Sequence, residues 1–243
     1  MKSGMLLLAA IGVCLIRLEG VQGQVKGPSR LVFDQAHGQQ PPPGQLSGLA
    51  TKLGLEIQTS AEPLTAKVLS AARILYLRAP SGEFTTAEAA AIVAFVKSGG
   101  SLLLVLDEEQ RQSLAKTRVN DLISPFGMRL TPDTEKLPNA GAVARAGEIN
   151  KADREVPYDG GRAVEGGTAF AFQLDKDGKP SHPYGAYVRL ANGGRIVVLA
   201  EGMASLFLGD PKGVRLVSDG NNPIYWGKDS AIFMEEVLAW LSR

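Results

Sequence analysis

The sequence predicts an α/β fold with a mostly parallel central sheet and an irregular or antiparallel insertion. Apolar strand patterns alternate with helical patterns over the first half of the chain, which is typical of parallel, doubly wound sheets. Two runs, at 101–106 and 194–200, are almost continuously apolar, as expected for central strands that are covered on both faces. With 243 residues, 44% of them hydrophobic, the chain can bury one sizeable core.

The order of elements follows from the spacing of apolar residues. We expect strands at 31–33, 55–59 and 71–80, and a helix at 45–53 between the prolines of 41–43 and Gly54. Thr85 and Glu88 have the spacing of a capping box, which predicts a helix that begins there and ends at 98–100. The strand 101–106 follows.

The second half of the chain is less regular. From 118 to 179 glycines and prolines are frequent and the apolar pattern is broken. Strands are expected at 170–174 and 184–190, paired antiparallel, within an insertion at about 118–190 on the edge of the sheet. After the core strand 194–200, a last helix is expected at 228–242, with Ile232, Phe233, Val237, Leu238 and Leu241 on its apolar face.

The N-terminus has the layout of a secretory signal peptide. Lys2 precedes an apolar stretch at 5–16, and small residues follow at 21–23. These 12 residues are fewer than the roughly 20 that span a bilayer. We therefore expect a cleaved signal peptide at 1–23, a short lead-in at 24–29, one domain at 30–243, and a secreted or periplasmic protein without a stable membrane span.

Composition excludes several classes of function. Cys14 is the only cysteine and lies in the expected signal peptide, so the mature chain can form neither a disulfide nor a thiolate nucleophile. The net charge of +1 argues against a nucleic-acid partner. We expect no cofactor.

Three segments carry a resemblance to a known family. They are Val32–Gln39 (VFDQAHGQ), Ala79-Pro80 and Val96–Leu104 (VKSGGSLLL). Together they resemble the class I glutamine amidotransferase-like superfamily, most closely the uncharacterised bacterial DUF4350 family, to which the segment 221–229 is also similar. Intraflagellar transport protein 52, gliding-motility proteins and trehalose-utilisation proteins would be more distant relatives. The resemblance implies a flavodoxin-like, amidotransferase-like three-layer sandwich.

The chain lacks the residues that catalytic members of this superfamily use. Their nucleophilic cysteine follows a central strand and pairs with a late histidine. Here the corresponding strand ends in Leu106-Asp107-Glu108-Glu109, and no histidine follows His182. Glutamine hydrolysis by that route is excluded, and the leading interpretation is a non-catalytic binding domain.

The strongest candidate site is the turn after the first strand, which carries Asp34, His37 and Gln39. Ligands of open α/β sheets bind beyond the carboxyl ends of the strands. With Ser81, Asn222 and Trp226, these residues would bind a small polar ligand, such as a carbohydrate, or an envelope protein partner. In the alternative interpretation, His37 hydrogen-bonds the backbone and Asp34 braces the loop.

Two other functions stay open. A hydrolase would use His37 with Asp34, Asp107 or Glu201 to activate water, with or without a metal. A scaffold in an envelope complex would keep a crevice without a function. Because Asp107 can also cap a helix that follows it, we predict no metal site.

Overall fold

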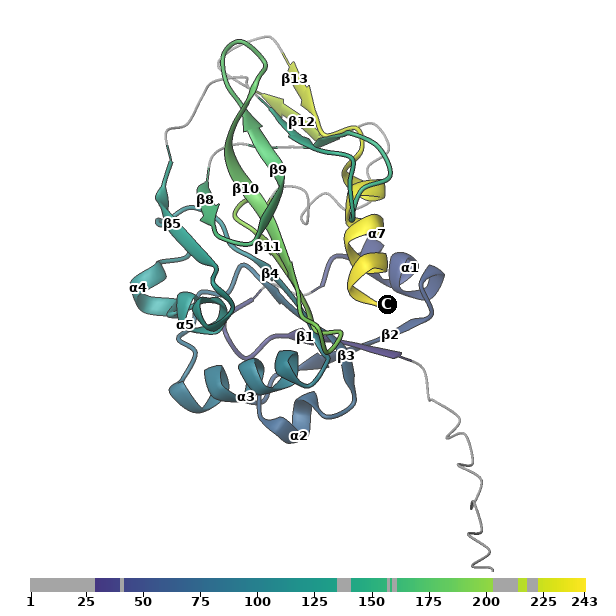
Figure 1. Cartoon of the computed structure of the whole chain (residues 1–243), viewed down its shortest axis with the longest axis vertical. Helices are drawn as coiled ribbons and strands as arrows, with labels where there is room; N and C mark the ends of the chain where they lie inside the picture. Colours follow the sequence, from purple (N-terminus) through teal and green to yellow (C-terminus); the bar gives the residue numbers. More distant parts are fainter. Residues whose placement is uncertain are drawn as a thin grey trace, which may run out of the picture.

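A large sheet forms the centre of a mixed α/β structure (Figure 1). The computed structural model describes residues 29–39, 42–134, 141–156, 158, 161–202, 214–217 and 223–243. The nine strands of the sheet are, in spatial order, β2 (Leu55–Ser60), β1 (Ser29–Asp34), β3 (Ala72–Arg78), β4 (Ser101–Val105), β11 (Arg195–Leu199), β10 (Pro180–Arg189), β9 (Thr168–Leu174), β6 (Ala142–Ala144) and β7 (Arg154–Val156). Two small sheets pair β5 (Arg129–Asp133) with β8 (Arg162–Glu165) and β12 (Val214–Val217) with β13 (Pro223–Trp226).

The sheet has a parallel half and an antiparallel half. Neighbouring strands from β2 to β11 run parallel, and those from β11 to β7 run antiparallel. All five side chains of β4 are buried, which explains why its sequence is continuously apolar. The predicted parallel strands and the antiparallel pair β9–β10 are confirmed.

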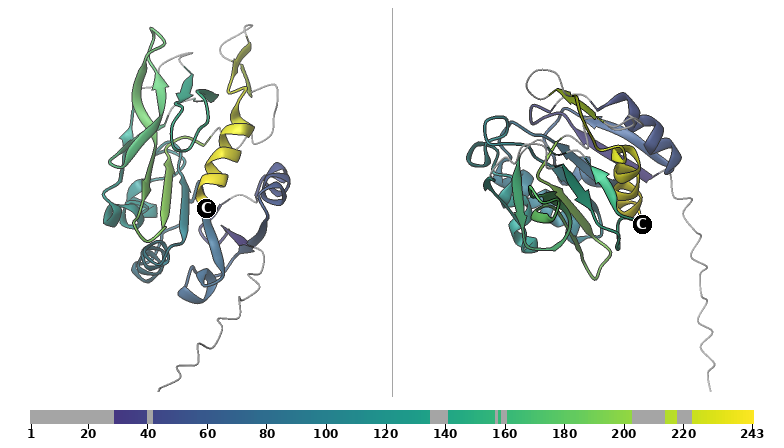
Figure 2. Two further views of the ribbon diagram at one scale, coloured as in Figure 1. Left: turned by 45° about the vertical axis from the view of Figure 1, so that its right-hand side comes forward. Right: turned by 90° about the horizontal axis from the view of Figure 1, so that it is seen from above.

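Helices cover both faces of the sheet (Figure 2). One face carries α1 (Gly44–Lys52) and α7 (Ser230–Leu241), and an exposed ion pair of 2.7 Å joins Lys52 Nζ of α1 to Glu235 Oε1 of α7. The opposite face carries α2 (Ala66–Leu69), α3 (Thr86–Lys97) and α5 (Asn120–Ile123). The short α4 (Leu114–Thr117) and the 3₁₀ turn η1 (Ser124–Phe126) flank α5.

The start of α3 confirms the predicted capping box. Thr85 Oγ1 accepts a hydrogen bond from the Glu88 N–H at 3.2 Å, and Glu88 Oε2 accepts one from the Thr85 N–H at 3.0 Å. These two bonds satisfy N–H groups that a helix leaves unpaired at its N-terminus. The cap also fixes the position of the Glu88 side chain, which matters for the site below.

Several local predictions were wrong. Asp107 caps no helix: the next helix, α4, begins at Leu114, and its cap is Ser113. Ile232, expected on the buried face of the last helix, is 40% exposed. The irregular middle contains strands β5 to β8, and the expected loop before α7 contains β12 and β13.

The expected signal peptide at 1–23 lies outside the described residues, as does the lead-in at 24–29 apart from Ser29, which begins β1. Within the described ranges, no helix combines the length and apolar character needed to cross a membrane.

Candidate functional site

The turn after β1 brings three predicted site residues together. Asp34, at the end of β1, is fully buried. Its Oδ2 lies 2.8 Å from His37 Nδ1 and accepts a hydrogen bond from Gln39 Nε2. Its Oδ1 accepts a hydrogen bond from the Ala36 N–H at 3.0 Å. The carboxylate therefore organises the whole turn, which agrees with the alternative interpretation that Asp34 braces the loop.

Gln39 joins this turn to the neighbouring strand. Its Oε1 accepts a hydrogen bond from the Arg78 N–H at the end of β3. Because the side-chain amide also donates to Asp34, both ends of the amide bond to protein groups. Gln39, 7% exposed, is thus a link between β1 and β3.

The second nitrogen of His37 contacts a residue that sequence reasoning missed. His37 Nε2 lies 3.2 Å from Glu88 Oε1, and the same oxygen accepts a hydrogen bond from the Leu64 N–H at 3.1 Å. The sequence predicts only that Glu88 caps α3. Nothing in the local sequence indicates that it also reaches His37, because the contact depends on how α3 packs beside the turn after β1.

Packing holds the imidazole ring in place. The ring stacks on Phe84 with a centroid distance of 3.9 Å and an interplanar angle of 22°. His37 is 5% exposed. The ring is therefore enclosed by a phenyl face and by two carboxylates, and its orientation is fixed.

The two carboxylates determine the charge of His37. Burial alone would lower the pKa of His37, but the hydrogen bond and charge of Asp34, followed by those of Glu88, raise it above its ordinary value. Burial likewise raises the pKa of Glu88, but hydrogen bonds from Thr85 and Leu64 and the charge of His37 outweigh this effect and lower it. The arrangement favours an imidazolium between two carboxylates.

This arrangement leaves His37 without a free nitrogen for catalysis. A general base needs an unprotonated nitrogen within reach of a substrate. Here each ring nitrogen faces a carboxylate oxygen, and an imidazolium has two N–H donors and no acceptor. The geometry is suited to holding β1, α3 and the loop before α2 together.

Ser81 reaches the same turn through the backbone. The N–H groups of Ser81 and Gly82 both donate to the His37 carbonyl at 2.9 Å. Gly38 has φ = +70°, and a Cβ atom there would lie 2.4 Å from Ser81 Oγ. Ser81 thus lies beside the turn that carries His37. Its backbone N–H makes a shorter hydrogen bond to this turn than its hydroxyl does, which donates to the Gly38 carbonyl at 3.4 Å.

Asp107 and Glu201 lie at the ends of the two next strands, β4 and β11. The sequence predicts both as carboxylates that could act with His37. The carboxylate that lies beside His37 Nε2 is that of Glu88 instead. Asp107 Oδ1 accepts a hydrogen bond from the Glu108 N–H at 2.9 Å, and Oδ2 lies 3.3 Å from Arg111 Nη1. Glu201 is 1% exposed.

Two buried tyrosines lie near Glu201. Burial, with a smaller effect of the Glu201 charge, raises the pKa of Tyr184 and raises that of Tyr158 to about 12. The two rings have a centroid distance of 5.3 Å. A neutral pair of phenols therefore lies beside this carboxylate.

A buried arginine that sequence reasoning missed holds the segment after β4. Arg162 of β8 is fully buried. Its guanidinium donates to the carbonyls of Asp107, at 2.8 Å, and Gln112, at 2.7 Å, and to Glu109 Oε2 at 2.8 Å. Arg162 lies in the irregular middle segment, where no pattern indicates a buried cation.

Arg78, at the end of β3, is a second buried arginine. It is 6% exposed, and its Nε has no hydrogen-bond partner. Within the described residues no carboxylate pairs with its guanidinium. An unpaired buried cation costs free energy of folding.

Two predicted ligand-binding residues are not joined to this group. Asn222 lies outside the described residues, and only the backbone of Trp226 is described, in β13, where it pairs with Val214. Among the described residues, no cluster of three or more His, Cys, Asp or Glu side chains is suited to a metal ion.

The fold and this turn define a mixed α/β protein whose strand-end histidine is held between two carboxylates. The model of one protein family, the IFT52 GIFT domain, matches residues 36–136, a range that includes His37, Gln39 and Glu88. Curated proteins gave no match.

Solved structures agree on the fold. The mmIFT52 N-terminal domain superposes with a TM-score of 0.62 at 18% identity, over 88% of this chain and 97% of that one. A GMP synthase-type protein from Thermoplasma acidophilum has a TM-score of 0.52 at 9% identity, over 89% and 96% of the two chains. At such identities the likeness concerns the fold alone.

These comparisons correct the family expected from the sequence. The resemblance of short segments places the chain closest to DUF4350 within the amidotransferase-like superfamily, with intraflagellar transport protein 52 as a distant relative, whereas the matching model is that of the IFT52 GIFT domain. The predicted ligand-binding function is wrong for the same reason. The secreted or periplasmic location, inferred from the signal-peptide layout of the N-terminus, is also wrong, because the matching model is that of an intraflagellar transport domain. The similarity is compatible with a protein partner and does not support a small ligand.

Proposed function

We propose that this chain is a non-catalytic, protein-binding component of an intraflagellar transport-type complex. The observation that carries the proposal is the match of residues 36–136 to the IFT52 GIFT domain. The likeness of the fold to the mmIFT52 N-terminal domain, over 88% of the chain, supports it. A cytoplasmic or ciliary location would accompany this function.

The site chemistry supports a binding function over a catalytic one. Both nitrogens of His37 face carboxylate oxygens at 2.8 and 3.2 Å, and Gln39 bonds at both ends of its amide. Groups bonded in this way stabilise a scaffold, because His37 cannot exchange a proton with a substrate, and Gln39 cannot hydrogen-bond one, without breaking a buried contact.

The order of the parallel strands supports a flavodoxin-like fold. The parallel strands have the order β2-β1-β3-β4-β11, which is the 2-1-3-4-5 order of flavodoxin-like sheets. We infer a flavodoxin-like domain at 30–243 whose insertion, at about 118–190, supplies the antiparallel strands. The coverage of 97% of the mmIFT52 domain supports one domain.

Reconstitution tests the proposal. The full chain would be mixed with an intraflagellar transport complex assembled without IFT52, with the IFT52 N-terminal domain as positive control, and the mixture analysed by size-exclusion chromatography. We expect the chain to co-elute with the complex and to compete with the control domain. Separate elution of the chain, while the control domain co-elutes, would refute the proposal.

A further inference from the structure

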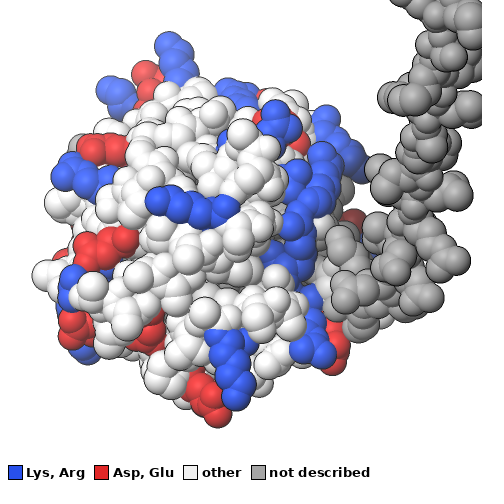
Figure 3. Space-filling model, turned by 60° about the horizontal axis from the view of Figure 1, so that its bottom comes forward, with Lys and Arg blue, Asp and Glu red and all other residues white. Residues whose placement is uncertain are grey.

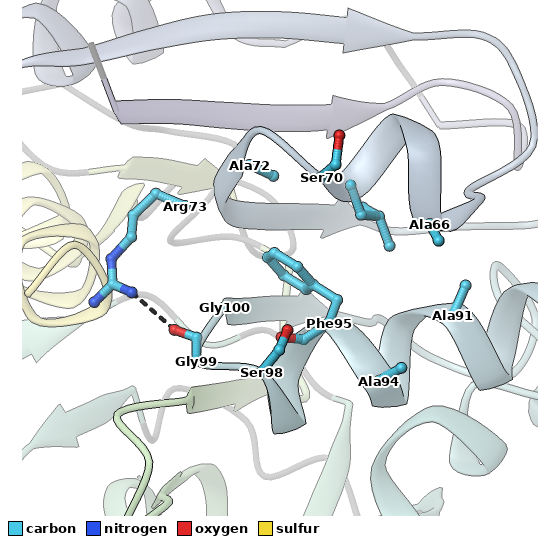
Figure 4. A pocket seen from close by; sticks show the side chains of 11 residues that line it. Ala66, Ser70, Ala72, Arg73, Ala91, Ala94, Phe95, Ser98, Gly99 and Gly100 are labelled. Atoms are coloured by element: carbon cyan, nitrogen blue, oxygen red, sulfur yellow. Dashed lines mark hydrogen bonds between the residues drawn. The ribbon is translucent and has the colours of Figure 1, made fainter. Parts of the chain in front are cut away.

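A groove separates α2 from α3 at the end of the sheet opposite to His37. Its volume is about 460 Å³, and it is lined by both helices, by the start of β3 and by the turn between α3 and β4. Small residues account for the open space, since Ala66, Ala91 and Ala94 face it where larger side chains would fill it (Figure 4). The ring of Phe95 forms an apolar part of the wall.

One end of the groove carries an arginine held in a fixed position. Arg73 Nη1 donates to the Gly99 carbonyl at 2.8 Å (Figure 4), and Nε donates to the Ser242 carbonyl at 3.2 Å. Nη2 donates to the Arg243 carbonyl. The carbonyls of Gly99 and Ser242 are neutral acceptors, so these two bonds orient the guanidinium without neutralising its charge.

Three further arginines lie at this end of the molecule: Arg195 Nη1 and Arg73 Nη2 both donate to the main-chain oxygen of Arg243, and Arg195 pairs with Arg189 across β11 and β10. Burial is the main cause that lowers the pKa of Arg195, and the charges of Arg73, Arg189 and Arg243 lower it further. In the described part of the chain, the only ion pair of these four arginines is that of Arg189 with Glu148, at 3.3 Å. Figure 3 shows Lys and Arg side chains gathered in a band on this side of the molecule.

The lining segments add positive charge and no negative charge. Residues 66–73 and 89–100 contain Lys67, Arg73 and Lys97 but no Asp or Glu. Lys67 and Lys97 lie in the last turns of α2 and α3. The carbonyls at the end of α3 are already occupied by the N–H groups of 98–100, so they do not offset this charge at the groove.

We propose that the groove between α2 and α3 binds an acidic segment of a protein partner, with an apolar side chain inserted between Ala91, Ala94 and Phe95. The groove supplies the apolar contact. Arg73, with Lys67 and Lys97 at the ends of α2 and α3, supplies the complementary charge. This inference rests on the proposed protein-binding function and names the surface that carries it. Because the basic groups lie at the rim, binding weakens with added salt.

A peptide assay on the full chain tests the surface. The probe is a fluorescein-labelled peptide of repeated Glu-Glu-Leu triplets, compared with Lys-Lys-Leu and Glu-Glu-Ser versions, at an ionic strength of about 10 mM, where the Debye length is about 30 Å. We expect polarisation to rise only with the Glu-Glu-Leu peptide and to fall with added salt. Equal binding of the Glu-Glu-Ser peptide, or no binding, would overturn the proposal.

A matched pair of variants locates the binding. Ala94→Leu fills the groove, whereas Ala90→Leu adds the same side chain at a position of the same helix that does not line the groove. We expect Ala94→Leu to weaken binding at least tenfold and Ala90→Leu to leave it unchanged. Equal effects of the two variants would place the binding elsewhere and overturn the inference.

The charge is tested separately because Arg73 has structural hydrogen bonds. Lys67→Glu with Lys97→Glu alters two residues of exposed helix ends, and Lys176→Glu with Lys179→Glu is the control on the β9–β10 turn. Only the first pair is expected to abolish peptide binding. Co-elution of the chain with the transport complex is measured in parallel to separate the two proposals. If the chain co-elutes but does not bind the peptide, the groove proposal alone is refuted. If it binds the peptide but does not co-elute, the transport function alone is refuted.

Discussion

Oε1 of Glu88 lies 3.2 Å from Nε2 of His37 and accepts a hydrogen bond from Leu64 at 3.1 Å. One carboxylate therefore caps α3, fixes the loop before α2 and pairs with the turn after β1. The other side of the imidazole is held by Asp34, so the triad of Asp34, His37 and Glu88 joins three segments that are distant in sequence. Its consequences for stability can be measured.

His37→Gln is expected to destabilise the fold. The substitution removes a buried cation and leaves two carboxylates facing each other without it, a change that typically costs about 3–5 kcal/mol. Urea unfolding followed by circular dichroism measures the cost. His182→Gln is the matched control, because the exposed His182 should contribute within about 0.5 kcal/mol. A His37 variant as stable as this control would show that the triad is not structural.

Stability is expected to depend on pH through the same triad. The raised pKa of His37 means that its contribution is complete below the ordinary value of 6.5 and is lost as pH rises through the raised pKa. The lowered pKa of Glu88 means that its contribution is complete above 4.5 and is lost as pH falls through the lowered pKa. We expect the contribution of the triad to be largest between pH 4.5 and 6.5.

Unfolding midpoints measured across the acidic and alkaline limits of this window test the dependence. In His37→Gln the loss of stability on the alkaline side should become shallower than in the unaltered chain. If both proteins follow the same pH profile, His37 does not change its protonation on folding.

Gly38→Ala tests the turn that carries His37. A non-glycine residue at φ = +70° costs about 1–2 kcal/mol, and the new Cβ would also lie 2.4 Å from Ser81 Oγ. We expect the double variant Gly38→Ala with Ser81→Ala to recover the steric part of the loss and not the conformational part. Urea unfolding of both variants and of Ser81→Ala alone separates the steric cost from the conformational cost. If the double variant recovers no stability, Ser81 moves aside freely and the contact costs nothing.

The sequence predicted the elements well where one segment determines them. The alternation of strands and helices, the capping box of Thr85 and Glu88, and the Asp34, His37 and Gln39 turn all depend on spacing within a few residues. Glu88 beside His37 and Arg162 beneath Asp107 could not be predicted, because those contacts depend on how distant segments pack. The family was misjudged because the Gly-Gly-Ser-Leu-Leu pattern at 99–103 reflects a strand entry common to many such folds.

Arg162→Met is expected to be strongly destabilising. The guanidinium satisfies the carbonyls of Asp107 and Gln112 and the carboxylate of Glu109, and methionine would leave these acceptors without their donor, at a cost of about 3–5 kcal/mol. Arg162→Lys should rescue little, because a single ammonium does not reproduce the planar arrangement of five N–H donors. Recovery of the unfolding midpoint by lysine would show that charge alone matters.

Arg78→Met is expected to have the opposite sign, although Arg78 is almost as deeply buried. Its Nε has no hydrogen-bond partner and, among the described residues, no carboxylate pairs with its guanidinium, so methionine removes a mostly buried, unpaired cation and keeps most of the apolar contact. The hydrogen bond to Gln39 is unaffected because it comes from the backbone N–H of residue 78. We expect an increase in unfolding free energy of about 1 kcal/mol or more, at the low end of the gain seen when buried ionic groups are replaced by apolar ones. Urea unfolding of Arg78→Met and Arg162→Met under the same conditions tests this expectation. If both variants lose stability, the Arg78 guanidinium has a stabilising partner. If Arg78→Met gains stability while Arg162→Met loses it, hydrogen bonding determines whether a buried arginine stabilises this fold.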